Sequence, residues 1–329
     1  MTRPSRVGFL GVGWIGRHRM EAMLSTGLIE AVAIADPHDE SRRAALDMAP
    51  MAATAEGLGD LLAQDLDGLV IASPSALHAE QSRQALEAGV AVFCQKPLGR
   101  TAAEVGAVID AARSADKLLG VDLSYRFTAG MQAMQRLTWR GELGRVFGVN
   151  LTFHNAYGPD KAWFYDPVLS GGGCVMDLGV HLVDLALWAL GWPEVDAVES
   201  HLLHEGRPLA DPARECEDYA VATITTAEGA IIRLTCSWRL SAGQDAVIAA
   251  EFYGTDGAAA LRNVGGSFYA LEASRMKGTW SEPLAASEED WGGRAAADWA
   301  RRRAAGERFD PESERLVDVA RVLDRIYGR

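Results

Sequence analysis

The sequence has 329 residues, of which 48% are hydrophobic and 23% charged, a composition that is typical of folded globular proteins and excludes a disordered chain. This length exceeds what one hydrophobic core usually serves, so we expect two domains. The formal charge of −13 repels nucleic-acid backbones and anionic lipid surfaces, so neither is an expected partner.

Strands and helices alternate over the first third of the chain. Predicted strands cover residues 6–11, 31–36, 66–73, 90–95 and 118–125, and predicted helices cover 15–25, 78–89 and 101–116. Thr101 is the expected N-cap of the last helix, and Gly89 is expected to close the one before it. Because parallel strands need right-handed crossovers, residues 1–122 should form a doubly wound α/β domain with a parallel sheet covered on both faces.

The pattern changes after residue 122. A helix near 130–140 is followed by predicted strands at 145–155, 194–203, 217–226, 230–238 and 246–255, most of them alternating apolar and polar residues. In the strand 230–238, one face is apolar and contains Ile232, Leu234, Cys236 and Trp238. Residues 123–329 should therefore form an α+β domain with a large, mostly antiparallel open sheet, and the apolar helix within 171–191 should pack on this sheet or against the first domain.

The last segments are predicted to be helical. Residues 286–310 mix charge with alanine and should form a surface helix, and residues 311–328 should form a final amphipathic helix that starts at Pro311 and packs back on the first domain. The open face of the sheet is an expected surface for a homodimer or homotetramer.

Cysteine usage and hydropathy indicate a cytoplasmic protein. The four cysteines, at positions 94, 174, 216 and 236, have no Cys-x-x-Cys spacing and therefore signal neither a disulfide framework nor a zinc ribbon. The apolar segments are too short or too interrupted by glycine to predict a membrane-spanning helix or a cleaved signal peptide.

A glycine-rich turn follows the first predicted strand. Gly11, Gly13 and Gly16 form a Gly-x-Gly-x-x-Gly pattern between a strand and a helix, which is the context of a dinucleotide-binding loop. The first glycine permits the tight turn, the second allows the backbone to approach a pyrophosphate, and the third allows close packing of helix on strand. Unpaired N–H groups at the helix start would face the phosphates.

An acidic residue closes the second strand. Asp36 lies twenty residues after Gly16, where a carboxylate accepts hydrogen bonds from the adenosine ribose hydroxyls and repels a 2′-phosphate. This favours NAD as the cofactor. Arg42 and Arg43 lie nearby and leave NADP as the less favoured alternative.

Two further loops lie at the same carboxyl edge of the predicted sheet, where open α/β folds bind ligands. Ser73, Pro74, Ser75 and His78 follow one strand, and Gln95 and Lys96 end the next. The expected cofactor-binding residues are Gly11, Val12, Gly13, Trp14, Ile15, Gly16, Asp36, Pro37, Ser73, Pro74, Ser75, His78, Gln95 and Lys96.

Asp177 and His181 are four residues apart in a predicted helical segment, which places both side chains on one face. A solvated helix face or a local hydrogen-bonded pair would produce the same spacing. The pair could also bind zinc with Cys174 or His154, but no further ligands occur at a zinc-site spacing, so we expect no metal.

The sequence resembles the glucose-fructose oxidoreductase and inositol dehydrogenase (Gfo/Idh/MocA) family. The resemblance spans residues 6–192 and is carried by the segments GVGWIG, IADP, IASPSALH, CQKPLG, YRF, GELG and GGGCVMDLGVHLVDLALWALG. It implies a Rossmann domain joined to an α+β domain, a nicotinamide cofactor, and a catalytic group made of Lys96, Asp177 and His181. The substrate contacts that it implies are Lys96, Arg126, His154, Asn155, Tyr157, Asp177 and His181.

The sequence departs from the family at one position of this group. Gln95 stands where the family commonly has glutamate before the lysine and proline, so a carboxylate that would touch the cofactor ribose or influence Lys96 is missing. Glutamine can still hydrogen-bond a ribose hydroxyl, but it favours the ammonium form of Lys96 less than glutamate would.

We therefore expect an NAD-dependent oxidoreductase that moves a hydride between the nicotinamide and a secondary alcohol or ketone of a sugar, an inositol or a related polyol. His181 is the expected general base, Asp177 would orient the imidazole or bind a hydroxyl, and Lys96 would stabilise the developing alkoxide. The alternatives are a biliverdin-reductase-like or diol dehydrogenase family member and a non-catalytic NAD-binding sensor or scaffold.

Overall fold

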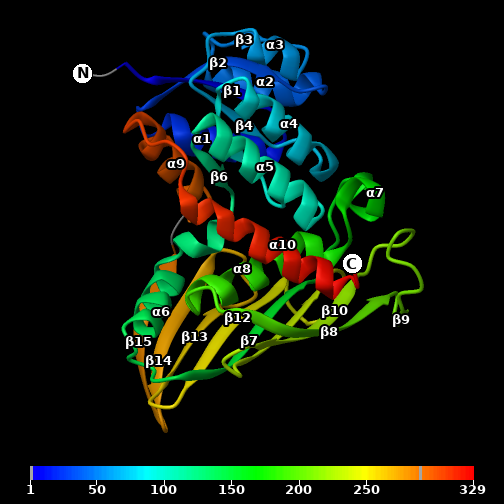
Figure 1. Cartoon of the computed structure of the whole chain (residues 1–329), viewed down its shortest axis with the longest axis vertical. Helices are drawn as coiled ribbons and strands as arrows, with labels where there is room; N and C mark the ends of the chain where they lie inside the picture. Colours follow the sequence, from blue (N-terminus) through cyan, green and yellow to red (C-terminus); the bar gives the residue numbers. More distant parts are fainter. Residues whose placement is uncertain (1–2, 289–290) are drawn as a thin grey trace. The chain divides into compact units, whose positions relative to one another are not determined.

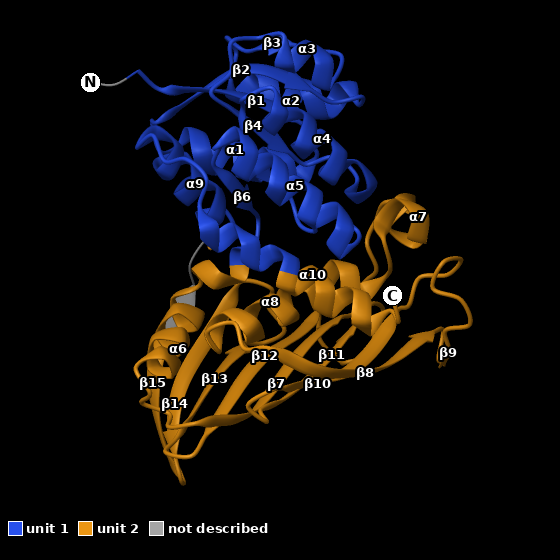
Figure 2. Ribbon diagram, in the orientation of Figure 1, with its two compact units in different colours: residues 1–124, 292–317 blue, residues 125–291, 318–329 orange. Residues whose placement is uncertain are grey.

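The computed structural model describes residues 3–288 and 291–329, and the chain divides into two compact units (Figure 1, Figure 2). Unit 1 contains Met1–Ser124 and Gly292–Val317, and unit 2 contains Tyr125–Trp291 and Asp318–Arg329. The first boundary lies two residues beyond the predicted one. Residues 292–317, which we expected in the second domain, cluster with the first instead.

Unit 1 contains a six-stranded parallel sheet in the order β3-β2-β1-β4-β5-β6. Its strands are β1 (Ser5–Leu10), β2 (Ile29–Ala35), β3 (Ala53–Thr54), β4 (Gly68–Ile71), β5 (Ala91–Cys94) and β6 (Leu119–Val121). This is the strand order of a Rossmann fold, and it confirms the predicted parallel sheet. Every residue of β4 and β5 is buried, as their uninterrupted apolar sequences indicate.

The helices of unit 1 that connect these strands are α1 (Trp14–Leu24), α2 (Asp39–Met48), α3 (Leu58–Leu62), α4 (Ser75–Glu87) and α5 (Ala102–Ala115). Thr101 caps α5, because its side chain accepts a hydrogen bond from the Glu104 N–H at 3.2 Å. Helices α2 and α3 were not predicted. Each buries a single residue, Ala45 in α2 and Leu61 in α3, so neither produces a readable apolar stripe.

A helix from the end of the sequence, α9 (Arg294–Ala304), belongs to unit 1, where it contacts α1, β5 and β6. A Cβ on Gly68 or Gly120 would lie 2.6 or 2.7 Å from the ring of Trp299, so this ring packs directly on the backbones of β4 and β6. The prediction of a helix at 286–310 is partly wrong, because residues 286–288 belong to strand β15 and the helix covers only Arg294–Ala304. Residues 289–290 of the predicted helix lie outside the described part of the chain.

Unit 2 contains a nine-stranded sheet in the order β15-β14-β13-β12-β7-β11-β10-β8-β9. Its strands are β7 (Val146–Asn155), β8 (Val195–His204), β9 (Arg207–Pro208), β10 (Tyr219–Thr226), β11 (Ile231–Ser237), β12 (Ala246–Gly254), β13 (Ala258–Asn263), β14 (Ala270–Lys277) and β15 (Trp280–Glu288). Neighbouring strands are antiparallel except for β7 and β11, which confirms the predicted mostly antiparallel sheet. Strands β13 to β15 were not predicted.

The longer helices of unit 2 lie on one face of this sheet (Figure 1). They are α6 (Ala129–Trp139), the π-helix η3 (Val175–Gly179) with its continuation α8 (Val180–Ala189), and the end of α10 (Arg315–Ile326); shorter segments are η1 (Ser124–Phe127), η2 (Ala162–Tyr165), α7 (Pro167–Ser170) and η4 (Pro311–Glu314). The apolar face of β11 is buried and Ile231 on the opposite face is exposed, as predicted for a half-buried strand. The final helix begins with a 3₁₀ turn at Pro311 and belongs to unit 1 only up to Val317.

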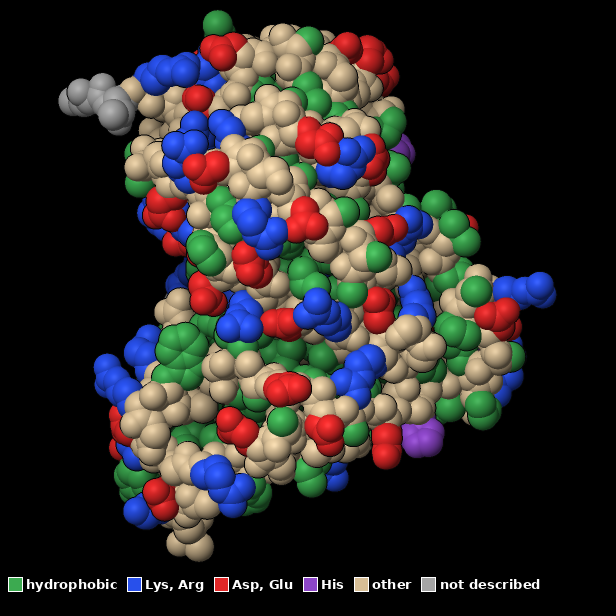
Figure 3. Space-filling view, viewed as in Figure 1, with side chains coloured by type: hydrophobic (Ala, Val, Ile, Leu, Met, Phe, Trp, Pro, Cys, Tyr) green, Lys and Arg blue, Asp and Glu red, His purple; other side chains and the backbone are tan. Residues whose placement is uncertain are grey.

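In the described part of the chain, one helical run, Pro167–Ala189, is long and apolar enough to cross a membrane, and 78% of its most apolar window is buried inside the protein. Core helices show the same burial, so this run is weak support for a membrane span. On the face drawn in Figure 3, lysine and arginine side chains are interspersed with aspartate and glutamate on both units.

Candidate functional site

The glycine loop between β1 and α1 has the geometry that a pyrophosphate requires. Gly11 has a φ of +84°, and a Cβ there would lie 2.5 Å from the carbonyl oxygen of Ala72, so only glycine fits. A Cβ on Gly16 would lie 2.2 Å from the carbonyl oxygen of Gly11. A Cβ on Gly13 would meet no atom within 4 Å, and α1 begins at Trp14 without a side-chain cap. The open space and the uncapped N–H groups fit a bound phosphate group.

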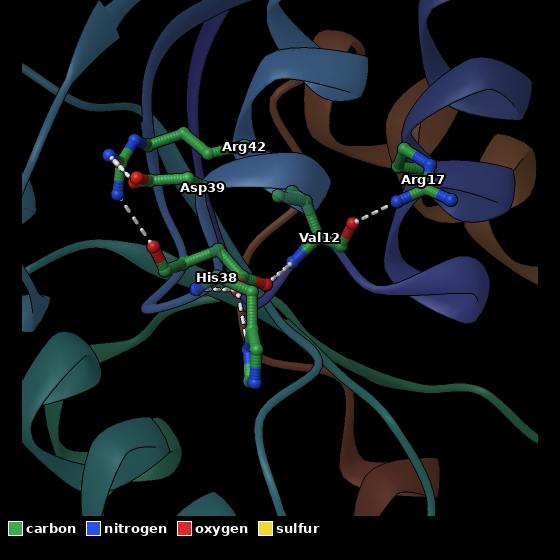
Figure 4. Close-up of polar contacts among 6 residues, drawn as sticks. Val12, Arg17, His38, Asp39 and Arg42 are labelled. Carbon is green, nitrogen blue, oxygen red and sulfur yellow. Dashed lines mark hydrogen bonds and ion pairs between the residues drawn. The ribbon is translucent and has the colours of Figure 1, made fainter. Parts of the chain in front are cut away.

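The carboxylate of Asp36 joins the end of β2 to the glycine loop (Figure 4). Its Oδ2 accepts a hydrogen bond from the Val12 N–H at 2.7 Å, and its Oδ1 accepts one from the His38 N–H at 2.8 Å. Nδ1 of His38 also lies 3.3 Å from Oδ1, whereas Oδ2 has only the Val12 N–H as a donor among the described residues and can accept a further bond from a ribose hydroxyl. Arg42 donates to the carbonyl oxygen of Asp36 at 2.9 Å and forms an ion pair with Asp39. Arg42 therefore already has an anionic partner, which disfavours it as a ligand of a 2′-phosphate.

Val12 and Trp14 are two further predicted cofactor residues, and both belong to the glycine loop or the start of α1. The carbonyl oxygen of Val12 accepts a hydrogen bond from Arg17 at 3.0 Å (Figure 4), which supports the loop from the side of α1. Trp14 is 63% exposed and stacks on His18, so its ring is accessible to a ligand. The remaining predicted residues at this edge are Ile15, Pro37, Pro74 and Ser75.

His78 is buried and bridges the loops that follow β4 and β5. Its Nδ1 lies 2.7 Å from the carbonyl oxygen of Pro97, and its Nε2 lies 2.6 Å from the carbonyl oxygen of Ser73. Burial lowers the pKa of His78. Because both ring nitrogens face protein carbonyls, His78 ties the two loops together, and its expected contact with the cofactor stays a prediction. The hydroxyl of Ser73 in turn donates to Gln81 at 2.6 Å.

Gln95 and Lys96 follow β5 at the same sheet edge. The backbone N–H of Gln95 donates to the carbonyl oxygen of Ile71 at 2.8 Å, and its side-chain Nε2 donates to Oδ2 of Asp122 at 2.6 Å. Asp122 was not predicted as a site residue. Its position in the sequence could have indicated it as a site residue, because it directly follows β6, the strand next to β5.

In unit 2, Asp177 and His181 lie on successive turns of one helical segment, as predicted. Asp177 is in the π-helix η3, and His181 is in the first turn of α8. The wide π turn was not predicted, and such turns are frequent at functional sites. The indole Nε1 of Trp238 donates to Oδ2 of Asp177 at 2.9 Å, and the ring of Tyr125 packs edge-on against His181 with centroids 5.0 Å apart.

A buried carboxylate holds the glycines that precede this helix. Glu217 accepts hydrogen bonds from the N–H groups of Gly173 at 3.0 Å and Val175 at 2.8 Å, and from the hydroxyl of Tyr327 at 2.7 Å. Burial raises the pKa of Glu217. A Cβ on Gly173 would lie 1.9 Å from the carbonyl oxygen of Glu217, so glycine is required there. Glu217, which sequence reasoning missed, thus fixes the entry to the helix that carries Asp177.

Arg126 pairs with a buried carboxylate of unit 2, Asp184. Its Nε donates to Oδ2 of Asp184 at 2.7 Å, and its Nη2 pairs with the other carboxylate oxygen. The guanidinium carbon also lies 5.7 and 5.2 Å from the ring centroids of Trp188 and Trp192. Burial raises the pKa of Asp184, and Arg126 opposes this shift. Arg126 therefore forms a bidentate pair with Asp184 within unit 2 through Nε and Nη2, and its expected contact with a substrate stays a prediction.

His154 lies near the end of β7, and its expected contact with the substrate stays a prediction. Phe153 faces the helices and packs against Tyr125, with ring centroids 5.7 Å apart. Because successive residues of a strand point to opposite faces, His154 lies on the other face, where its Nδ1 is 2.8 Å from the Ser237 hydroxyl. His181 packs against Tyr125 on the helix face. His154 and His181 are therefore on opposite sides of the sheet.

Asn155 and Tyr157 continue from the end of β7. Asn155 is two residues after Phe153 in the same strand, so its side chain points to the same face as Phe153, the helix face. Its Oδ1 accepts a hydrogen bond from the Tyr157 N–H at 2.7 Å. The hydroxyl of Tyr157 donates to Asp245 at 2.6 Å. The expected substrate contact of Asn155 stays a prediction, whereas the polar group of Tyr157 already has a protein acceptor.

Lys96 belongs to unit 1, and Asp177 and His181 belong to unit 2. That these three side chains meet at one nicotinamide ring stays a prediction. All four cysteines carry free thiols, and the described residues contain no group of three or more His, Cys, Asp or Glu side chains that could hold a metal ion.

Both parts of the chain match profiles of one protein family. Residues 5–123 match the profile described as "Oxidoreductase family, NAD-binding Rossmann fold", and residues 131–260 match the profile described as "GFO/IDH/MocA C-terminal domain". D-glucoside 3-dehydrogenase of Escherichia coli K12 is 28% identical over 272 residues, which cover 79% of this chain and 78% of that protein.

Two further proteins are similar over most of their length. A protein of Amycolatopsis mediterranei, provisionally named a UDP-kanosamine synthase oxidoreductase subunit, is 30% identical over 272 residues, which cover 78% of this chain and 75% of that protein. The crystal structure of a levoglucosan dehydrogenase in complex with NADH and levoglucosan superimposes with a TM-score of 0.82 at 20% identity, covering 99% of this chain and 98% of that one.

Proposed function

Because the chain belongs to the Gfo/Idh/MocA family of NAD(P)-dependent oxidoreductases, we propose that it transfers a hydride between NAD and a secondary alcohol or ketone of a sugar, an inositol or a related polyol. One observation carries the choice of catalytic residues. Asp177 is held by the buried indole of Trp238 at 2.9 Å, one helical turn before His181. The names of the glucoside and levoglucosan dehydrogenases support this substrate class.

The residues of the glycine loop fit the adenine dinucleotide half of the cofactor. The N–H groups at the start of α1 would bind the pyrophosphate beside Gly13, and the Asp36 carboxylate would accept the ribose hydroxyls. When bound, NAD supplies the hydride acceptor at its nicotinamide ring. The carboxylate of Asp36 and the ion pair of Arg42 with Asp39 favour NAD over NADP.

His181 takes the hydroxyl proton of the substrate as the alcohol is oxidised, because an imidazole has the basicity suited to this step near neutral pH. Asp177, fixed by Trp238, orients the imidazole or a neighbouring hydroxyl. Lys96 donates to the oxygen on which negative charge develops. In the reduction direction the same groups return the proton.

The test is NAD⁺ reduction over a panel of glucosides, anhydro sugars and inositols by the wild type, by His181→Ala and by His201→Ala. His201 is an exposed histidine of β8, so its variant is the matched control. His181→Ala should lower kcat by about 10²- to 10⁴-fold, the usual value of a positioned general base, while NADH still binds. Equal loss in both variants, or full activity of His181→Ala, would remove His181 from this role.

NADH binding without turnover of any polyol would instead favour a sensor or scaffold, and turnover of simple diols or of a bilin would favour the other family activities. A cytoplasmic location is part of the same proposal and is supported by the four free thiols. We further propose a homodimer or homotetramer through the open face of the nine-stranded sheet, on which Ile231 is 49% exposed. Light scattering that gives the mass of one chain would refute this assembly.

A further inference from the structure

A buried amide and a buried carboxylate form a pair beside Lys96 in unit 1. Gln95 follows β5 and Asp122 follows β6, two neighbouring parallel strands that are in register at Cys94 and Val121. Gln95 is 8% exposed and Asp122 is 2% exposed. The 2.6 Å bond from the Gln95 amide to Oδ2 of Asp122 is therefore shielded from solvent.

Two more donors complete the surroundings of this carboxylate. Arg19 of α1 donates from Nε to the same Oδ2 at 2.6 Å, and Ser124 donates from its hydroxyl to Oδ1 at 2.5 Å. Arg19 also reaches the Ser124 hydroxyl from Nη2 at 3.2 Å. The site thus contains one carboxylate, one guanidinium and one amide, a set in which the buried charges are paired.

Hydrogen bonds anchor the backbone on either side of Lys96. The N–H of Asp122 donates to the carbonyl oxygen of Cys94 at 3.0 Å, and the Gln95 side chain returns from β5 to Asp122. On the other side of Lys96, the carbonyl oxygen of Pro97 is held by His78 at 2.7 Å. Both chain neighbours of Lys96 are therefore anchored within unit 1.

We propose that Gln95 and Asp122 are positioning residues that act as one unit, in which the hydrogen bond between their side chains holds the turn that carries Lys96. The inference rests on the proposed function, in which Lys96 stabilises the developing alkoxide. Its physical basis is the hydrogen-bond pattern: the Gln95 amide is a donor, and an ionised glutamate at this position would have no hydrogen to offer Asp122.

The pairing predicts a reciprocal pattern of defects. Gln95→Glu places two carboxylates where one amide hydrogen bond of 2.6 Å now lies, and their repulsion should displace the turn that carries Lys96. Asp122→Asn leaves the buried Arg19 without its carboxylate. The double variant Gln95→Glu with Asp122→Asn again has one carboxylate, one amide and one guanidinium, so it should recover.

The first experiment is a double-mutant cycle on kcat, KM and thermal stability. Each single variant should lower kcat about tenfold or more, and the double variant should return to within about threefold of the wild type, because contacting residues couple strongly. Gln64→Glu on the exposed surface after α3 is the matched control and should change nothing. Purely additive losses in the double variant would overturn the pairing.

The second experiment measures the environment of the Lys96 side chain by NMR and does not require turnover. The sequence contains only four lysines, Lys96, Lys117, Lys161 and Lys277, so ¹³C-methylated lysines give few NMR signals, and Lys96→Arg assigns the one of interest. This signal should move in Gln95→Glu and return to its wild-type position in the double variant. An unchanged signal in Gln95→Glu, or a displaced one in the double variant, would refute the positioning role.

The two experiments separate this inference from the proposed function. A wild type that turns over no polyol would refute the proposed function, while the NMR signal and the stability cycle would still decide whether the pair positions Lys96. Where Asp122→Asn alone does not fold, the comparison of Gln95→Glu with the double variant decides the question, since the second substitution must then restore what the first removes.

Discussion

The hydrogen bond from Trp238 to Asp177 offers the sharpest test of the chemical site, and the perturbation is Trp238→Phe. Trp238 is 3% exposed, and its indole Nε1 donates to Oδ2 of Asp177 at 2.9 Å. The aromatic neighbours are Phe164 and Tyr165, with ring centroids 6.4 and 5.5 Å away. Phenylalanine keeps an aromatic ring among them and removes the donor, so the variant isolates the hydrogen bond as far as one substitution can.

A hydrogen bond to a charged group contributes about 1.5–3 kcal/mol. If Asp177 must keep this orientation in the transition state, losing the bond should lower kcat by about 10- to 100-fold, since each ~1.4 kcal/mol of barrier is a factor of ten. The bond also exists before substrate binds, so the free energy of unfolding should fall by a similar ~1.5–3 kcal/mol. KM should change little, because the bond is internal to the protein.

The assay is steady-state kinetics on the best substrate together with urea unfolding, with Trp280→Phe as the control. Trp280 lies in β15 and is 52% exposed, so its variant should leave kcat and stability unchanged. A Trp238→Phe enzyme that loses stability but keeps the wild-type kcat would show that the bond serves folding alone, and the reasoning that places Asp177 in catalysis would be wrong.

Three further outcomes follow from unit 1 and unit 2. Gly13→Ala should weaken NADH binding about tenfold or more in a fluorescence titration without lowering Tm, because its Cβ meets no protein atom but occupies the space expected for the pyrophosphate. Asp36→Asn should raise the kcat/KM ratio of NADP⁺ over NAD⁺ by about tenfold or more, because it removes the charge that repels a 2′-phosphate. Burial raises the pKa of Glu217 above 4.5, so its contribution to stability is complete below pH 4.5 and is lost as the pH rises through the folded-state pKa. The wild type should therefore lose stability as the pH rises through this range, whereas Glu217→Gln has no group at this position that titrates there. In urea titrations, the free energy of unfolding of the variant minus that of the wild type should increase with pH.

The parallel sheet was predictable because its signals are local. The uninterrupted apolar runs of β4 and β5 and the glycine turn after β1 each occupy a few consecutive residues. Helix α9 could not be assigned to the same unit from the sequence, because its contacts, among them those of Trp299 with Gly68 and Gly120, are with residues more than 170 positions away. A helix rich in charge and alanine carries no signal for its partner.

The substrate residues show the same limit. Arg126 was expected to bind substrate, and the structure shows that Asp184, 58 residues later, accepts hydrogen bonds from its Nε and Nη2. The sequence alone does not show whether an arginine has an ion-pair partner in the folded protein. His154 was expected to contact the substrate. The sequence did not show which face of the sheet it occupies, because a shift of one residue in the register exchanges the two faces, and in the structure Phe153 lies on the helix face.

The residues that sequence reasoning missed are themselves informative, because two of them are buried carboxylates. A buried carboxylate is costly unless several donors surround it, so it is stable only where the fold supplies those donors. Asp122 finds them in Arg19, Ser124 and Gln95, and Glu217 finds them in the backbone before η3 and in Tyr327. Motifs therefore point to the residues that we propose do the chemistry, whereas the donors that surround Asp122 and Glu217 come from distant parts of the chain and become visible only in the folded structure.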